Sequence, residues 1–291
     1  MLAPCPYIST HENPLSDERN VVRLGRFRRK SDGRWIQRFT CKDCGRGFSH
    51  ATRSDCYRQN KRQLNDKLRK LFASGLSQRR LAKLFGISRT TVARKFEFLG
   101  TRAFNDIRQT RPIEPLIEIL EFDDMESFEH SKLKPVSIAI AVENKTRRIL
   151  DLEVAQMPAK GPLAARSIKK YGPRKDERTQ ARARLFQRLT ERVSPFALLK
   201  SDMNPQYPAT VKKFFPLAEH QKFKGRRGCV IGQGELKRGG FDPLFSFNHT
   251  AASFRANVNR LFRRTWNTTK KRERLAAHMA IYAQYHNNEL I

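Results

Sequence analysis

The order of strand-like and helix-like segments predicts an α/β chain in which two small modules precede a larger α/β domain. Three observations support this prediction. Apolar strand-like runs alternate with helical periodicity after about residue 111, a helix–glycine–helix pattern precedes them, and a CxxC pair of cysteines lies in the first fifth of the chain. We therefore expect modules at 1–58 and 59–110 and a third domain at 111–291.

The composition indicates a folded protein with a polyanionic partner. The chain has 291 residues, 38% of them hydrophobic, and a formal net charge of +31 from 59 basic and 28 acidic side chains. Ribosomal or membrane-surface binding gives a similar balance. Five cysteines, an odd number, favour a reducing compartment and metal binding over disulfides.

The ends and the apolar runs of the chain predict no membrane association. Residues 1–7 lack the basic start and apolar core of a signal peptide. The longest apolar run of the second half, residues 136–142, is too short to span a bilayer. We expect a cytoplasmic, nucleoid-associated protein.

The first module carries a candidate zinc site. Cys41-Lys-Asp-Cys44 is a CxxC knuckle, and the alternating stretch 35–40 predicts a strand that leads into it. A second knuckle is incomplete: Cys5 has no partner two positions on, and His11 is the nearest soft ligand. The predicted site is Cys5, His11, Cys41 and Cys44, holding Zn²⁺.

A basic rim is predicted next to this site. Residues 30–33 have the composition of a hairpin turn, and five cations precede or begin it. Such a cluster suits phosphate contacts, and the alternative is a solvated face. Its members are Arg23, Arg26, Arg28, Arg29 and Lys30.

The second module has the pattern of a helix-turn-helix. Helices are expected at 65–73, at 77–85 after an N-cap serine, and at 89–99 after Ser88, with glycines between them. Ala82, Ile87 and Val92 would point inward. A plain three-helix bundle is the alternative. For DNA reading, the exposed candidates near the start of the last helix are Arg89, Thr90, Arg94 and Lys95.

The third domain has the element order of a ribonuclease-H-like fold. Strands are expected at 116–122, 135–142 and 148–155, followed by a basic connector at 160–175. A helix at 176–193, a strand at 196–201, a helix at 208–215 and a strand at 217–223 follow. Two more helices, at 248–265 and 271–287, complete the order.

Two aspartates follow strands that are neighbours in such a sheet. Asp123 ends the first strand and Asp202 ends the fourth. Paired carboxylates at strand tips can hold the two Mg²⁺ ions that clamp the attacking and leaving oxygens of a phosphodiester. The alternative for either residue alone is a solvated carboxylate.

Three segments resemble the DDE-type insertion-sequence transposases, closest to the insertion-sequence-one group and its relatives. Residues 123–128 resemble the Asp-Glu-x-Trp-x-Phe motif, residues 201–207 the Thr-Asp-x-x-Pro-x-Tyr motif, and residues 247–270 the last catalytic helix. The resemblance also covers the zinc-ribbon and helix-turn-helix region. It implies Asp123, Asp202 and Asn248 as catalytic metal ligands, and Arg255 and Lys270 as DNA-binding residues.

The sequence departs from the family pattern at three places. Asn248 stands where the family has Glu, which removes one negative charge from the metal site. Glu126 stands in place of the motif Trp. A Gly-rich insertion brings Glu235, which is the alternative third ligand.

The resemblance implies a transposase that binds the ends of its element and catalyses Mg²⁺-dependent strand cleavage and transfer on double-stranded DNA. We expect a dimer or larger homo-oligomer, because two element ends must be joined. The first alternative is a catalytically inactive DNA-binding protein derived from such an enzyme. Asn248, which stands in place of a catalytic Glu, supports this alternative. A ribosome- or RNA-binding zinc-ribbon protein is the other, and the two aspartates count against it.

Overall fold

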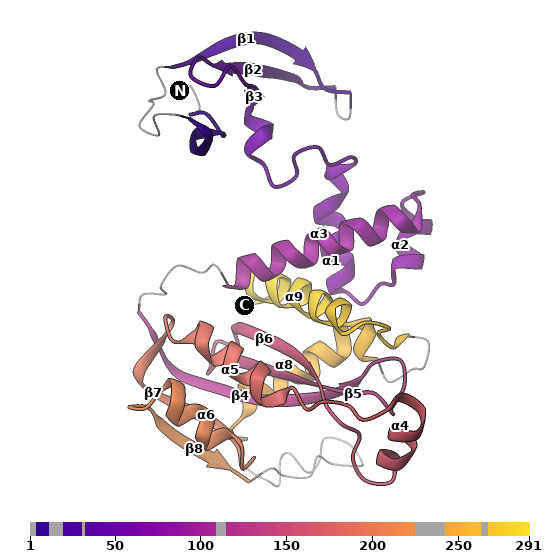
Figure 1. Cartoon of the computed structure of the whole chain (residues 1–291), viewed down its shortest axis with the longest axis vertical. Coiled ribbons are helices and arrows are strands. Elements are labelled where there is room, and N and C mark those ends of the chain that lie inside the picture. The colour runs from indigo at the N-terminus through magenta and orange to yellow at the C-terminus, as the bar shows by residue number, and fades with distance from the viewer. Residues whose placement is uncertain (1–3, 12–19, 31–32, 109–114, 225–241, 263–266) are drawn as a thin grey trace. The chain divides into compact units, whose positions relative to one another are not determined.

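The chain divides into two compact units, Met1–Asn65 and Asp66–Ile291. The computed structural model describes residues 4–11, 20–30, 33–108, 115–224, 242–262 and 267–291 (Figure 1). The predicted helix-turn-helix therefore belongs to the same compact unit as the α/β domain that follows it.

The first unit is a small antiparallel sheet with short 3₁₀ turns. Strand β1 (Val21–Arg28) pairs with β2 (Trp35–Cys41), and β2 pairs with β3 (Gly47–Ser49). The 3₁₀ turns are η1 (Ile8–Thr10), η3 (His50–Arg53) and η4 (Arg62–Leu64). Beyond Val21, all of β1 is exposed. A unit this small buries little apolar surface and needs another source of stability. Its core cluster is Cys5, Val21, Phe39, Cys41 and Phe48.

Three helices open the second unit. They are α1 (Asn65–Ala73), α2 (Gln78–Leu84) and α3 (Arg89–Arg108). The predicted caps are confirmed: Ser77 Oγ accepts a hydrogen bond from the Arg80 amide at 3.3 Å, and Ser88 Oγ accepts one from the Thr91 amide at 3.1 Å. Ala82 and Val92 are buried as expected, and Ile87 is half-buried.

The mixed sheet of the second unit has the order β6-β5-β4-β7-β8. β4 (Ile117–Phe128) pairs antiparallel with β5 (Pro135–Glu143) and parallel with β7 (Val193–Asp202). β6 (Ile149–Gln156) and β8 (Glu219–Phe223) lie at the edges. The predicted strands are therefore present, but β4 extends to Phe128. The prediction that the first strand ends at Asp123 is wrong, because β5 pairs with β4 as far as Phe128.

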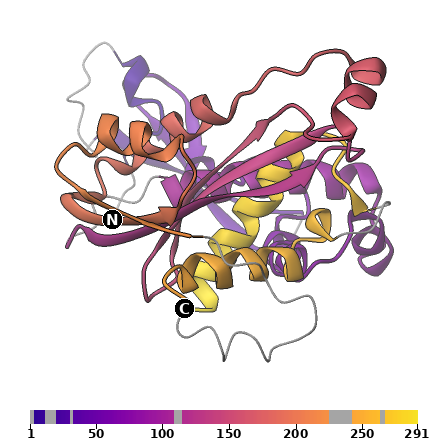
Figure 2. The same ribbon diagram turned by 90° about the horizontal axis from the view of Figure 1, so that it is seen from below.

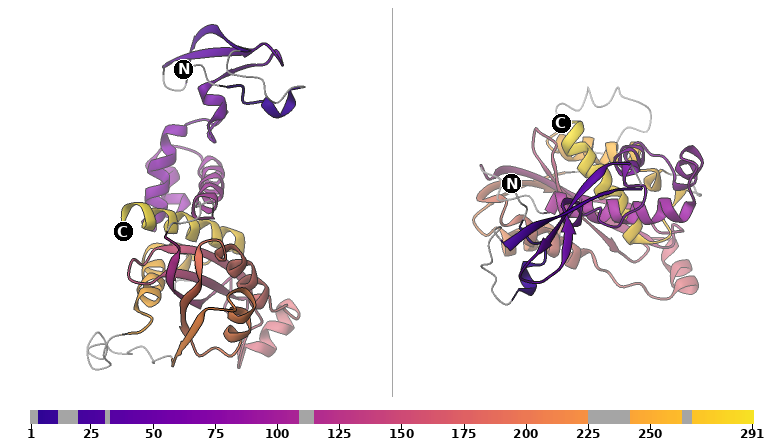
Figure 3. Two further views of the ribbon diagram at one scale, coloured as in Figure 1. Left: turned by 90° about the vertical axis from the view of Figure 1, so that its left-hand side faces the viewer. Right: turned by 90° about the horizontal axis from the view of Figure 1, so that it is seen from above.

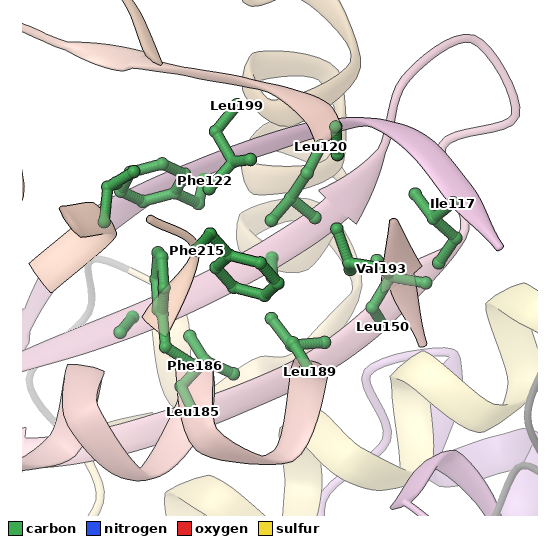
Figure 4. Packing of buried hydrophobic residues seen from close by; sticks show 14 of the residues in the cluster. Ile117, Leu120, Phe122, Leu150, Leu185, Phe186, Leu189, Val193, Leu199 and Phe215 are labelled. Carbon is green, nitrogen blue, oxygen red and sulfur yellow. The ribbon is translucent and has the colours of Figure 1, made fainter. Parts of the chain in front are cut away.

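Helices cover both faces of this sheet (Figure 2). On one face, α5 (Arg178–Leu189) and α6 (Tyr207–Phe214) close an apolar core that includes Phe122, Phe186 and Phe215 (Figure 4). α8 (Phe245–Asn257) packs against β4 and β5, and α9 (Arg272–Glu289) against β6. The 3₁₀ turn η5 (Asn259–Leu261) follows α8.

The stretch at 160–175, which we predicted to be a connector, contains the helix α4 (Leu163–Tyr171). The helix predicted at 248–265 begins earlier and ends at Asn257. These two predictions are wrong in extent, whereas the order of the other elements agrees with the sequence analysis.

Helix α3 lies against α9, the last helix of the chain (Figures 1 and 3). At their contact a Cβ on Gly100 would lie 2.6 Å from the Cβ of Ala277, so the helices approach closely because Gly100 has no side chain. Gln284 donates to Asp106 at 2.7 Å, and Arg108 donates to Asp151 of β6 at 3.2 Å. These contacts tie α3 to the sheet domain.

Within the described residues, no helix is both long enough and apolar enough to cross a membrane.

Candidate functional site

The structure brings the four predicted metal ligands of the first unit together. The ligand atoms of Cys5, His11, Cys41 and Cys44 all lie within 4.8 Å of one another. Cys5 Sγ is 3.8 Å from Cys44 Sγ, and Cys41 Sγ is 3.5 Å from His11 Nε2. Thiolates about 2.3 Å from a tetrahedral zinc ion are about 3.8 Å apart, so the cluster could hold a metal ion and is compatible with zinc.

Groups around the cluster affect its ligands in different directions. Burial raises the pKa of Cys5 to about 11, whereas the surroundings of His11 and Cys44 suit metal binding. His11 Nδ1, the ring nitrogen turned away from Cys41, lies 3.8 Å from Asp43 Oδ2, in the position of the carboxylate that orients a ligating histidine. Burial raises the pKa of Cys44, but hydrogen bonds from the Arg46 amide and from neighbouring ligands lower it to about 7. A thiol with that pKa supplies a thiolate readily.

The second candidate site lies where β4 and β7 run side by side. Glu121 of β4 pairs with Lys200 of β7 in parallel register. If this register is continued by two residues along each strand, Asp123 of β4 lies opposite Asp202 of β7. The sheet therefore brings the two predicted aspartates next to each other, as the sequence analysis expected.

Asp123 is held in a defined geometry. Tyr207 Oη donates a hydrogen bond to Asp123 Oδ1 at 2.8 Å, and the Asp124 amide donates to the same oxygen at 2.6 Å. Burial and the nearby charge of Asp202 raise the pKa of Asp123 to about 7. Two carboxylates that repel each other in this way are the arrangement that a bound cation relieves.

Behind the pair, Asp124 anchors a buried ion pair. Arg182 Nη1 is 2.7 Å from Asp124 Oδ2, and the Arg182 side chain is only 1% exposed. Arg182 also contacts Gln206 and lies 5.2 Å from the ring centre of Tyr207. The Arg182 network thus fixes both the Tyr207 ring and the strand that carries Asp123.

Glu121 is a further site residue that the sequence analysis did not identify. It lies two positions before Asp123, on the same face of β4, and is 1% exposed. Its Oε2 accepts a hydrogen bond from the Phe247 amide at 2.8 Å, and its other oxygen contacts Asn144. Glu121 therefore fixes the first turn of α8 against the strand that carries Asp123.

Asn248, the predicted third ligand, lies in that first turn but is exposed. Its Nδ2 donates to Asp242 Oδ2 at 2.7 Å, and Asp242 also accepts from the Leu244 amide at 3.0 Å. This hydrogen bond joins Asn248 to Asp242, which lies in the turn before α8, and not to Asp123 or Asp202. Glu235, the alternative ligand, lies outside the described residues.

The predicted DNA-binding residues divide into two groups. Arg89, Thr90 and Arg94 are exposed at the start of α3, as expected. Lys95 is only 3% exposed. The prediction that Lys95 faces solvent is wrong, because Lys95 lies between the buried Val92 and Leu99 on the inner face of the helix.

Arg255 and Lys270 differ in position from each other and from the aspartate pair. Arg255 is exposed near the end of α8. The residue before Lys270, Thr269, forms a bridge with Glu129, and Lys270 Nζ lies 3.1 Å from His130 Nδ1. Glu129 lies beyond the end of β4, about 20 Å of extended chain from Asp123. Lys270 therefore lies beyond the carboxyl end of β4, whereas Asp123 lies near the middle of this strand.

Glu126, which replaces the family tryptophan, is exposed and forms an ion pair with Lys160 at 2.8 Å.

No family model matches this chain, and no curated protein matches it.

Proposed function

We propose that this chain is a DNA transposase that binds the ends of its element and catalyses metal-dependent strand cleavage and strand transfer. One observation supports the proposal most strongly. Asp123 and Asp202 lie on adjacent parallel strands, and their charges interact. Together with the high net charge and the exposed basic start of α3, this arrangement suits cleavage of a phosphodiester in DNA.

The residues present fit a divalent cation at the pair. Asp123 and Asp202 would hold Mg²⁺ through carboxylate oxygens, the ligands that this ion prefers. The ion would neutralise charge on the phosphate and activate the attacking oxygen. Tyr207 and the Asp124 amide orient one oxygen of Asp123, and no described residue donates a hydrogen bond to the other. Glu121 keeps α8 against the same strand.

The proposed zinc ribbon would stabilise the first unit around Cys5, His11, Cys41 and Cys44. The exposed Arg89, Thr90 and Arg94 of α3 would read the element end in the major groove. We propose that the protein acts on DNA as a dimer or larger homo-oligomer and that it is cytoplasmic.

The test is to purify Asp123→Asn and Asp202→Asn and to assay DNA carrying the inverted repeats that flank the coding region. Each variant should lose cleavage in Mg²⁺ and retain binding in gel shifts, because only a carboxylate charge is removed. Glu126→Gln is the matched control, since this exposed carboxylate is paired with Lys160. Retained cleavage in either aspartate variant would contradict the assignment.

A second function, an inactive DNA-binding derivative of such an enzyme, is favoured by one observation. Asn248 is neutral, exposed and hydrogen-bonded to Asp242. If the wild-type protein binds these repeats but cleaves nothing in Mg²⁺ or Mn²⁺, this second function is correct. If Asn248→Ala lowers cleavage and Asn248→Glu restores it at low Mg²⁺, Asn248 is a metal ligand of the active enzyme.

A further inference from the structure

A cavity of about 560 Å³ lies in the second unit, away from the aspartate pair. Residues from α1, α2, α3, η5 and α9 line it. Three cations face it, from α2, from η5 and from the segment before α9; they are Arg79, Arg260 and Lys270. Its volume is in the range of pockets that bind small molecules, and a phosphate group alone would fill a small part of it.

Arg260 has an unusual environment. Its guanidinium lies 5.3 Å from the ring centre of Phe96, and no acidic side chain among the described residues forms an ion pair with it. The charge that affects the pKa of Arg260 is that of another cation, Arg274, which pairs with Glu97. Burial and Arg274 lower the pKa of Arg260 to about 10, so the side chain is still charged at neutral pH.

Two other arginines buried in this unit have acidic or carbonyl partners for at least one guanidinium nitrogen. Arg182 pairs with Asp124 at 2.7 Å. Arg192 donates to the carbonyl oxygens of Ile107 and Leu150, each at 2.9 Å. A partly buried cation without an acidic partner is costly for the folded state, and a bound anion removes that cost. Arg260 is therefore the group in this cavity that most favours an anionic ligand.

The rest of the lining fits a larger ligand than phosphate. Gln78, Asn259 and Asn267 present amide groups, which both donate and accept hydrogen bonds. Phe72 and Phe96 contribute an apolar floor. Amides that match the edge of a base, next to aromatic carbon, are the groups by which proteins hold a nucleobase.

We propose that this cavity binds a nucleotide, with Arg260, Lys270 and Arg79 holding the phosphate and the amide and phenyl side chains holding the base. The same chemistry is offered by a free deoxynucleoside monophosphate and by a nucleotide of a DNA strand. The second source rests on the proposed function. The cavity itself does not, because it shares no residue with the aspartate pair.

The experiment is calorimetric titration of the full-length protein with dAMP, deoxyadenosine and inorganic phosphate in separate runs. dAMP should bind at least about tenfold more tightly than either part alone, because phosphate and base are held together. Arg260→Gln should weaken dAMP binding by about tenfold or more, since it loses a bidentate phosphate ligand. Arg166→Gln, which removes the same charge from the exposed face of α4, should bind dAMP as the wild type does.

A melting measurement separates a ligand role of Arg260 from a structural one. Arg260→Gln should melt at or above the wild-type temperature without ligand, because it removes a poorly compensated charge. Lys270→Gln is the second variant and should also weaken dAMP binding. Equal binding of dAMP by the wild type and Arg260→Gln, or no binding of dAMP by the wild type, would overturn the proposal.

Two further arms identify the source of the nucleotide. A single-stranded 12-mer that competes with dAMP, and that Arg260→Gln binds less well, indicates a nucleotide of a DNA strand. A 12-mer that fails to compete indicates a free nucleotide. The double variant Asp123→Asn/Asp202→Asn should bind dAMP as the wild type does, so loss of cleavage and loss of this site are measured separately.

Discussion

Arg182 is a fully buried cation that depends on one carboxylate. Its side chain is 1% exposed and its partner Asp124 is 11% exposed, with 2.7 Å between them. Removal of one member of such a pair leaves the other as an uncompensated buried charge or forces it to take up a proton. This pair therefore governs the stability of the sheet region that carries Asp123.

We predict that Arg182→Met lowers the free energy of unfolding of the second unit by about 3–5 kcal/mol. The reason is that Asp124 remains buried without its cation. The double variant Arg182→Met/Asp124→Asn should lose less than the sum of the single variants, because no charge is left unpaired. Urea unfolding of the four proteins measures this coupling, and additive losses would contradict it.

His278 makes the stability of the second unit depend on pH. It is fully buried, with Nε2 2.9 Å from the Phe72 carbonyl oxygen. Burial, with a smaller contribution from the charge of Arg260, lowers its pKa from 6.5 to about 4. The unfolded chain therefore takes up a proton on His278 at a higher pH than the folded chain does.

We predict that the contribution of neutral His278 is complete above pH 6.5 and is lost progressively as the pH falls to about 4, by about 3 kcal/mol in total. Urea unfolding at pH 7, 6 and 5 gives the slope. His278→Gln keeps a donor for the Phe72 carbonyl and should have a shallower slope. The wild type and His278→Gln share the other buried histidines. Identical slopes for the two proteins would therefore show that His278 does not cause the pH dependence.

At the residue scale, the sequence predicts the aspartates better than their surroundings. β4 and β7 are parallel neighbours, so the proximity of Asp123 and Asp202 follows from the order and direction of these two strands, although only Asp202 ends its strand. The contacts that fix them join residues far apart in the chain: Tyr207 is 84 residues from Asp123, and Phe247 is 126 from Glu121. Side-chain pairs at such separations depend on packing that periodicity does not contain.

At the scale of elements, the extent of a strand is predicted wrongly where polar residues interrupt its apolar pattern. β4 continues through the polar stretch Asp123–Ser127 because β5 pairs with it there, and the sequence shows no apolar alternation. α4 was missed for a different reason: its helical pattern lies between prolines and among lysines, which we interpreted as a connector. Lys95 could have been recognised as buried, because positions 92, 95, 96 and 99 lie on one face of a helix.

The contact between α3 and α9 depends on a small residue. We predict that Gly100→Ala destabilises the second unit by about 1–3 kcal/mol, because its new Cβ would meet the Cβ of Ala277 at 2.6 Å. Ala277→Gly should relieve the clash, so Gly100→Ala/Ala277→Gly should be more stable than Gly100→Ala alone. Thermal melting checks this order. Failure of the second change to restore stability would show that the helices do not meet at this pair.

The exposed start of α3 gives a second prediction for this helix. Arg89→Ala and Arg94→Ala should each weaken binding to the element end by about tenfold, because each removes a side chain proposed to contact a base or phosphate. Arg102→Ala, an exposed arginine further along the same helix, is the control. Gel shifts with element-end and unrelated DNA measure the change. Equal losses on both DNAs would indicate phosphate contacts without base reading.

At the scale of the whole molecule, the two units differ in what holds them together. The second unit buries an extensive apolar core between its sheet and helices. The first unit has the small cluster Cys5, Val21, Phe39, Cys41 and Phe48, and two of these residues are predicted metal ligands. The sequence predicts the metal ligands from their spacing. It does not predict that the helix-turn-helix helices share a compact unit with the sheet, because that depends on how α9 packs on α3.

This difference predicts two separate responses to metal removal. A zinc chelator should unfold the first unit, since without metal its small core and exposed β1 cannot offset the loss of chain entropy. The melting of the second unit should not change. Circular dichroism and calorimetry of the full chain would then show loss of one transition only, with release of about one zinc ion per chain. Cys41→Ser should mimic the chelator, whereas Cys56→Ser should not, because Cys56 lies outside the ligand cluster. If Cys41→Ser and Cys44→Ser together retained stoichiometric zinc, the four-residue site would be wrong, and another set of ligands would have to stabilise the first unit.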